Sequence, residues 1–432
     1  MSLEVLIWIA LAVLLVMGTP IFVSLGMASI TVLLLSDIPL SLVMIDLIKV
    51  SDMFPLLAVV GFVFAGALME RGGMAAQIVE VASMLVGHIR GGLGIVTILG
   101  CMFFASMIGS GPGTVAAMGS IMIPSMIKRG YSPEYAAGVS ATGGTLGILI
   151  PPSVGFIIYG TLTSTSVGKL FAGGIGPGIL LVVLYSAYIL IRCYIKKDLC
   201  PNIPKAERLP IKEQLKLAKG LILPILIVLA VLGSIFLGIA SPTESAAVGA
   251  LGAIIASLVY KRFSWKMLAE AASRTFTTTG MVMWILFGAN CFSAVLIMTG
   301  IPSMLKVFIT SLSLPPMLIV FFMMLTYFIL GCFLEETTML FITIPIYMPI
   351  LSSFGMDPIW FGVLFMIAMQ MAYITPPFGF SLFFMKSIAP KDITTVDIYK
   401  SVPPFIVIQL IAVLICMFVP QIVTFLPNLL YG

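Results

Sequence analysis

Two polar segments interrupt apolar stretches of this 432-residue chain, and their residue types are the ones best suited to do chemistry. The segment 109–114 places three glycines and a proline inside an apolar stretch at 95–127. The segment 334–339 carries two adjacent carboxylates, Glu335 and Glu336. An unpaired amide or carbonyl is costly in hydrocarbon, so broken backbone at membrane depth is tolerated only inside protein or beside a wet cavity. Each break therefore predicts a binding site.

Broken helices offer two kinds of ligand at their ends. The N-terminal ends present unpaired N–H groups and positive dipole, which suit a substrate carboxylate, whereas unwound carbonyls and C-terminal ends suit Na⁺. Hydroxyl and amide side chains near the breaks add further oxygen atoms: Ser106, Ser110, Thr114 and Thr145 in the first half of the chain, and Thr337, Thr338, Gln370 and Thr375 in the second. We therefore expect two pseudo-symmetric cation sites that flank one substrate.

Each of these residues also has a structural interpretation. Glycine and serine in membrane helices often serve close packing, which explains Ser110 or Thr114 equally well when each is taken alone. Glu335 and Glu336 are stronger candidates, because a carboxylate at the bilayer centre costs ~2.5 kcal/mol or more. A role for one of them in capping or in a hydrogen bond between helices remains the alternative. The glycine pattern at 109–113 lacks the lysine of a phosphate-binding loop, so no nucleotide site is expected.

The two breaks occupy matching places in an internal repeat. Five positions recur at a constant shift of 225 residues, namely Pro124, Gly130, Pro133, Pro151 and Pro152 with Pro349, Gly355, Pro358, Pro376 and Pro377. The same shift places Ser110 opposite Glu335, and Thr145 opposite Gln370. Two related halves with broken helices in corresponding positions are typical of a secondary transporter, with its binding site at the repeat interface.

The composition requires a membrane. The chain is 60% hydrophobic and 9% charged, with a mean hydropathy of +1.20, against roughly 45–50% and about 25% in soluble proteins. The net charge of +5 implies no nucleic-acid partner, since cytoplasmic loops of membrane proteins are rich in Lys and Arg. The N-terminus offers Glu4 and no basic segment, which favours a retained first span over a cleaved signal peptide.

The cysteine and histidine content gives little support for a metal centre. The six cysteines show no CxxC spacing, and we interpret them as small hydrophobic residues rather than as disulfides or metal ligands. The single histidine, His88, sits beside Arg90 at the end of an apolar segment. Glu134 and Glu244, each close behind a proline, are interpreted as charges at helix N-termini.

The apolar segments predict an all-α polytopic membrane protein with inverted repeats, each holding a re-entrant helical hairpin and a discontinuous helix. The hairpin arms are expected at 95–108 with 115–127 and at 317–330 with 340–351, and the discontinuous helices at 135–159 and 359–384. Further helices are expected at 54–69, 75–87, 170–191, 221–239, 245–260, 275–298, 302–312 and 406–425. One long tilted helix is preferred for 3–35, with two short helices as the alternative.

Charge placement orients these segments. The basic loop at 192–219 is expected to be cytoplasmic. Counting crossings from it opens the first hairpin to the cytoplasm, where basic residues gather at Arg71, Arg90, Lys128 and Arg129. The second hairpin then opens to the opposite side, where 352–355 carries no positive charge. The two halves are therefore expected to be inverted.

Four motifs in order resemble the large membrane subunit of tripartite ATP-independent periplasmic (TRAP) transporters. They are the segments 109–119, 143–153, 241–250 and 375–379, and the resemblance covers essentially the whole chain. It implies a multi-pass protein of the bacterial inner membrane that takes up an organic acid with Na⁺ as the coupling ion, by an elevator motion. It also implies two protein partners: a periplasmic substrate-binding protein and a separate small four-helix membrane subunit.

The resemblance also implies the site residues. Substrate contacts would come from Ser110, Gly111, Thr114, Glu335, Glu336, Thr337 and Thr338. Na⁺ contacts would come from Ser106, Gly109, Ser110, Gly143, Gly144, Thr145, Leu334, Glu335, Thr338, Gln370, Tyr373 and Thr375. Many family members resemble Phe-Leu-Asp at the second tip, whereas this chain has a glutamate at 335, one methylene longer. Sialic acid, C4-dicarboxylates and keto acids all stay open as substrates.

We expect five segments along the chain: N-terminal scaffold helices at 1–70, a first transport unit at 71–165, scaffold helices with the cytoplasmic loop at 166–274, a second transport unit at 275–390, and a C-terminal scaffold helix at 391–432. The alternative function is a standalone Na⁺/dicarboxylate symporter or ion exchanger with the same hairpin plan. An intramembrane enzyme is disfavoured, because the acidic residues pair with threonines rather than with a histidine.

Overall fold

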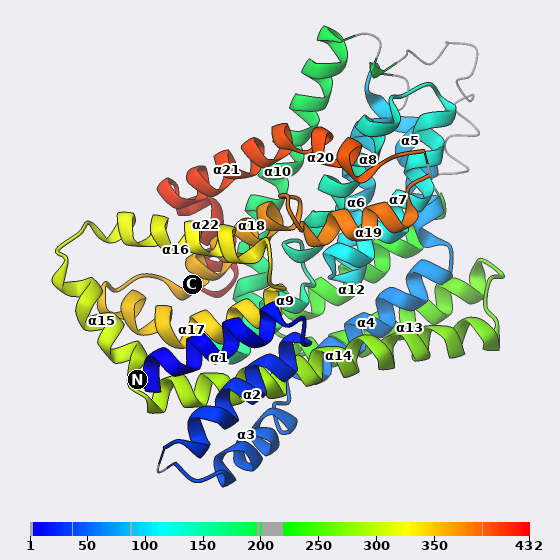
Figure 1. Ribbon diagram of the computed structural model, residues 1–432. Coiled ribbons are helices and arrows are strands. Elements are labelled where there is room, and N and C mark those ends of the chain that lie inside the picture. Colours follow the sequence, from blue (N-terminus) through cyan, green and yellow to red (C-terminus); the bar gives the residue numbers. More distant parts are fainter. Residues whose placement is uncertain (1–2, 37, 87–88, 197–198, 201–218, 391) are drawn as a thin grey trace.

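The computed structural model describes residues 3–36, 38–86, 89–196, 199–200, 219–390 and 392–432, and every regular element in these ranges is a helix (Figure 1). Within them, four helices are long and apolar enough to cross a membrane, or six if each of two bent pairs is one span. The prediction of an all-α polytopic membrane protein is confirmed. Most of the predicted cytoplasmic loop at 192–219, and His88, lie outside the described residues.

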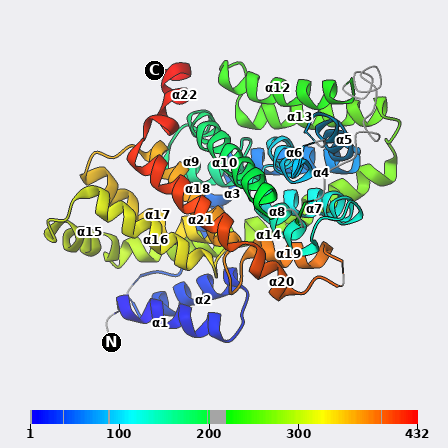
Figure 2. The same ribbon diagram turned by 90° about the horizontal axis from the view of Figure 1, so that it is seen from above.

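The N-terminal part comprises α1 (Leu3–Val16), α2 (Ile21–Leu34), α3 (Ser41–Ser51), α4 (Leu56–Arg71) and α5 (Met74–Val86). The preference for one helix over 3–35 is wrong, and the two-helix alternative holds. Gly18 takes a left-handed φ of +77° and Pro20 has no N–H to donate, so the helix ends between them. The Thr19 hydroxyl then donates to the Leu14 carbonyl at 2.8 Å. As a result α1 and α2 lie side by side (Figures 1 and 2).

The first half continues with α6 (Gly92–Ile108), α7 (Gly111–Lys128), α8 (Pro133–Thr145), a 3-10 turn η1 (Leu146–Ile148), α9 (Val154–Thr163) and α10 (Val167–Ile195). The hairpin α6–α7 and the broken helix α8–α9 are where the sequence predicts them. The non-helical break spans 149–153, since η1 prolongs the helix beyond Thr145.

The second half comprises η4 (Lys219–Leu221), α12 (Ile222–Phe236), α13 (Pro242–Val259), α14 (Trp265–Met298), α15 (Ile301–Ser311), α16 (Pro316–Gly331), α17 (Glu336–Ser353), α18 (Pro358–Tyr373), α19 (Phe380–Ile388), α20 (Thr395–Ser401), α21 (Pro403–Phe418) and α22 (Gln421–Tyr431). The helix expected at 275–298 begins ten residues earlier, because Ser264 caps it by accepting from the Met267 amide at 3.0 Å. The expected segment border between 274 and 275 thus falls inside α14.

The helix plan repeats as expected. The hairpin α6–α7 has its counterpart in α16–α17, and the broken helix α8–α9 has its counterpart in α18–α19. Both breaks contain a cis proline pair, Pro151-Pro152 and Pro376-Pro377. The short helices that precede the hairpins, α5 and α15, lie at opposite ends of the molecule in both views, as inverted halves require (Figures 1 and 2). The Tyr159 hydroxyl of α9 donates to the Pro358 carbonyl of α18 at 2.6 Å, which links the halves.

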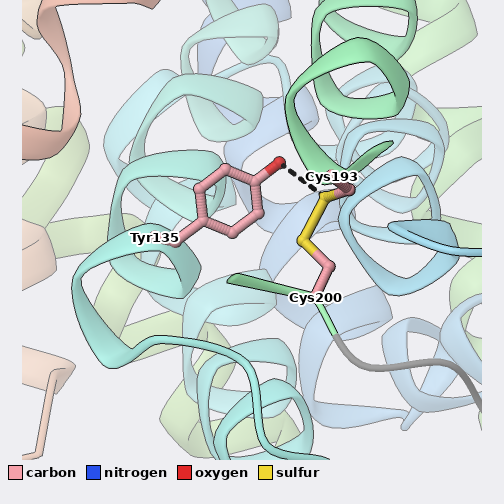
Figure 3. Close-up of a disulfide and its surroundings, with 3 residues drawn as sticks. All are labelled: Tyr135, Cys193 and Cys200. Atoms are coloured by element: carbon pink, nitrogen blue, oxygen red, sulfur yellow. Dashed lines mark hydrogen bonds between the residues drawn. A yellow bond between two sulfur atoms is a disulfide. The ribbon is translucent and has the colours of Figure 1, made fainter. Parts of the chain in front are cut away.

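One cysteine pair departs from the sequence-based interpretation. Cys193 and Cys200 form a disulfide at the end of α10, with the Tyr135 hydroxyl 3.6 Å from the Cys193 sulfur (Figure 3). The chain folds back after α10, where the Leu199 carbonyl accepts from the Ser132 amide at 3.4 Å. A seven-residue spacing does not reveal such a return, so the expectation of six unpaired cysteines is wrong here. Cys101, Cys291, Cys332 and Cys416 remain buried thiols, as expected.

Candidate functional site

A cavity of about 320 Å³ lies where the two hairpins and the two broken helices meet. Two of its walls are helix faces, from α4 and α14, and the rest comes from the hairpin turns, α9, α18 and α19. The lining residues are Val59, Val63, Gly66, Ala67, Glu70, Ile108, Gly109, Ser110, Pro112, Gly113, Val154, Arg274, Thr278, Met281, Val282, Glu335, Glu336, Thr337, Tyr373, Phe380 and Phe384. Both breaks singled out in the sequence therefore face one space.

Four helices begin at this cavity. The first turns of α7, α9, α17 and α19 contribute lining residues. An α-helix leaves its first N–H groups without intrahelical partners and carries partial positive charge at that end. Four such ends around one cavity favour an anionic group inside it.

The tip of the first hairpin is locked against the break in the first broken helix. Gly109 ends α6 with a φ of +67°, and a Cβ at this position would lie 2.2 Å from the Pro152 carbonyl oxygen. The Gly109 carbonyl accepts from the Val154 amide at 3.3 Å. Ser110 then caps α7 by accepting from the Gly113 amide at 3.4 Å. Only glycine fits at 109, because it alone tolerates both the backbone conformation and the close approach.

The tip of the second hairpin carries the carboxylates. Glu335 accepts from the Thr337 hydroxyl at 2.8 Å, and the Glu336 amide donates to the Tyr373 hydroxyl at 3.2 Å. Tyr373, at the end of α18, thereby ties this tip to the second break. One carboxylate oxygen of each glutamate is buried and has no hydrogen-bond partner among the described residues. Buried carboxylate oxygens of this kind are stabilised by a cation or by a proton.

Hydroxyl groups of the first half are already engaged with backbone carbonyls. Ser106 donates to Phe103, Thr114 to Ser110 and Thr145 to Thr142, at 2.6, 2.8 and 2.7 Å respectively. Because a hydroxyl that donates one hydrogen bond keeps its lone pairs, each could still be a cation ligand. Thr145 also accepts from the Gln409 side-chain amide at 3.3 Å, a contact from α21 that the sequence did not indicate.

Gly143 and Gly144 lie in the last turn of α8, before the break. A Cβ on Gly144 would lie 2.2 Å from a Val115 methyl group, so this glycine lets α8 approach α7 closely. The contact between the first tip and the break is made instead at Gly147, where a Cβ would lie 2.5 Å from the Ser110 carbonyl oxygen. The position of Gly147 shows that unwinding begins later than the glycine pair suggests.

In the second half, several predicted cation ligands are buried polar groups without partners. Within the described part of the chain, the Thr338 hydroxyl and both side-chain amide atoms of Gln370 make no hydrogen bond. The Ser381 hydroxyl of α19 is in the same condition, and sequence reasoning missed it because the repeat shift pairs it with Phe156. Thr375 donates to the Met371 carbonyl at 2.6 Å. Leu334 lies in the turn between α16 and α17.

The cavity thus gathers some of the predicted site residues and leaves out others. Those that line it are Gly109, Ser110, Glu335, Glu336, Thr337 and Tyr373. Those that do not are Ser106, Gly111, Thr114, Gly143, Gly144, Thr145, Leu334, Thr338, Gln370 and Thr375.

Two charged residues in the cavity wall were missed from the sequence. Arg274 of α14 and Glu70 of α4 form an ion pair with Nη1 and Oε2 2.5 Å apart, and both line the cavity. Each lies at the edge of an apolar stretch, which is the ordinary place for a charge in a membrane protein. Their separation of 204 residues lies outside the 225-residue register, so the repeat does not point to them.

Comparison with known proteins places the fold and the family. Residues 8–422 match the family model "Tripartite ATP-independent periplasmic transporter, DctM component". A C4-dicarboxylate TRAP transporter large permease protein of Pseudomonas aeruginosa is 35% identical, covering 94% of both chains, and one of Vibrio cholerae is 36% identical, covering 99% and 98%. The crystal structure of the Alcanivorax borkumensis YdaH transporter has a similar fold, with a TM-score of 0.63 over 86% of each chain at 14% identity.

Proposed function

Because the chain belongs to the DctM family of tripartite ATP-independent periplasmic transporters, we propose that it is the large permease subunit that carries an organic acid across the membrane in symport with Na⁺. Family membership makes the chain a transporter permease and not an enzyme. The observation that carries the proposal is the cavity in which four helix N-termini meet two hairpin tips.

The charge of the cavity explains why an organic acid would need a cation. The lining carries three carboxylates, of Glu70, Glu335 and Glu336, against the one guanidinium of Arg274. An anionic substrate adds negative charge to a site that is already negative. Two unit charges 4 Å apart interact by about 4 kcal/mol at an effective dielectric constant of 20, so uncompensated binding would be unfavourable. Na⁺ at the two tips would offset this repulsion, and it would find oxygen ligands there.

The two cation sites would be those expected from the repeat. The first would combine the tip at 109–114 with the end of α8 and η1, and the second would combine the tip at 335–338 with Gln370 and Thr375. The unpartnered oxygens of Glu335, Thr338 and Gln370 support the second site. Transport would be a movement of the hairpins and broken helices against the remaining helices, as in an elevator.

The substrate would arrive with a partner. Since relatives carry names of C4-dicarboxylate permeases, a C4-dicarboxylate is the first substrate to test. A periplasmic binding protein would deliver it, and a separate small four-helix membrane subunit would brace this chain in the bacterial inner membrane.

The test is uptake into proteoliposomes that hold the chain with its small subunit. Labelled succinate, sialic acid and pyruvate are offered with and without the purified binding protein, and with and without an inward Na⁺ gradient. Uptake that needs both supports the proposal and identifies the substrate. Uptake with Na⁺ alone supports the standalone symporter, and uptake without Na⁺ refutes the coupling.

A further inference from the structure

The described lining of the cavity contains a single cationic side chain, that of Arg274. The cavity faces of α4 and α14 are otherwise mostly apolar or small, with Val59, Val63, Ala67 and Met281 among them. A lone guanidinium in such a wall is the natural counter-ion for an organic anion.

Arg274 has donors to spare for a second acceptor. A guanidinium offers five N–H donors in a planar fork that matches a carboxylate, and the pair with Glu70 uses Nη1. The side chain of Arg274 is 38% exposed and that of Glu70 is 25% exposed, so the pair is open to the cavity rather than sealed in protein. Another carboxylate could therefore reach the guanidinium without unfolding the wall.

A neighbouring ion pair argues that the contact serves more than helix association. Arg71 and Glu270 join the same two helices one turn away, and neither residue lines the cavity. Attachment of α4 to α14 is thus already provided on the outer side. The Glu70–Arg274 pair differs from it in one respect, namely that both of its members face the substrate space.

We propose that Arg274 binds a carboxylate of the transported acid, and that Glu70 is the internal anion that occupies Arg274 while the cavity is empty. This inference rests on the proposed function and adds a substrate contact on the wall opposite the helix N-termini. A diacid then has two kinds of partner, the N–H groups at the hairpin tips and the guanidinium of α14. Substrate competes with Glu70, so loss of Glu70 and loss of Arg274 have opposite effects on affinity.

The test measures the KM for labelled succinate in the proteoliposome assay, with binding protein and Na⁺ at saturating concentrations. Arg274→Gln is expected to raise the KM at least tenfold, and Glu70→Gln is expected to lower it. A merely structural ion pair predicts the same direction for both variants. Arg71→Gln is the matched control, because it breaks the neighbouring pair outside the cavity, and its KM is expected to stay within twofold of the wild type.

A second measurement guards against a folding defect. Arg274→Lys keeps the charge but not the planar fork, and the rise in melting temperature that succinate and Na⁺ produce in the purified protein is expected to shrink. Equal KM changes in the Glu70 and Arg274 variants, or none, overturn the inference while leaving the proposed function intact. Failure of the wild-type complex to take up any acid refutes the proposed function itself.

Discussion

Replacing Gly109 by alanine tests whether the first hairpin tip must lie against the first break. Gly109 has a φ of +67°, where an L side chain costs about 1–2 kcal/mol. Its Cβ would also stand 2.2 Å from the Pro152 carbonyl oxygen. The substitution therefore combines a backbone penalty with a collision against main chain.

The collision decides the functional outcome. Bringing the Cβ from 2.2 Å to an ordinary contact of 3.4 Å demands a relative shift of about 1.2 Å between tip and break. Neither partner moves freely, since the Val154 amide donates to the Gly109 carbonyl at 3.3 Å, just beyond Pro152. A misplacement near 1 Å at a binding site costs on the order of 100-fold in favourable cases. We expect Gly109→Ala to lower Na⁺-dependent uptake tenfold or more.

Gly355→Ala provides the control. Gly355 has a nearly equal φ of +65°, but nothing lies within 4 Å of its added Cβ. Both variants are expected to lose similar thermal stability, measured as the melting temperature of the purified protein, whereas only Gly109→Ala loses uptake. Wild-type uptake by Gly109→Ala, or an equal loss in Gly355→Ala, would refute the close packing of tip and break.

Three further substitutions test the remaining contacts. Gln370→Leu removes a buried amide that has no partner among the described residues, so in Na⁺-free buffer the melting temperature should hold or rise, while the Na⁺ concentration for half-maximal uptake rises severalfold; an unchanged Na⁺ dependence counts against a ligand role. Thr338→Val should likewise raise that Na⁺ concentration, and Thr343→Val should not, because the Thr343 hydroxyl is already hydrogen-bonded; equal effects would contradict the assignment. Tyr159→Phe removes the 2.6 Å hydrogen bond to Pro358 between the halves and should cost about 1 kcal/mol of stability with uptake unchanged, so a large loss of uptake would show that this link takes part in transport.

The features that the sequence predicted correctly are those with a local physical cause. Proline pairs at 151–152 and 376–377 remove helix donors wherever they occur, so the two broken helices could be placed without a structure. Constant spacing then related the halves. Ser241 and Glu244 form a capping box at the start of α13, which bears out the interpretation of that glutamate as a helix N-terminal charge.

The features that were missed depend on contacts between distant parts of the chain. A glycine in an apolar segment permits either unwinding or close packing, and only the presence of Val115 beside Gly144 decides for packing. The same holds for Glu70, whose partner Arg274 lies on a helix far along the chain. Charges at segment ends are common, so neither residue stood out before α4 and α14 were brought together.

The two halves share a helix plan but not a charge distribution, and this difference bears on the coupling. The shift of 225 residues pairs Ser110 and Gly111 of the first tip with Glu335 and Glu336 of the second. The dipoles of four helix N-termini act on the cavity from both halves, whereas the carboxylates act from the second tip only. Under the proposed symport, the cation at the second tip therefore has more negative charge to neutralise than the cation at the first. Because the repulsion between these glutamates and an acid is relieved only when that cation is present, the second site has to fill before the substrate binds.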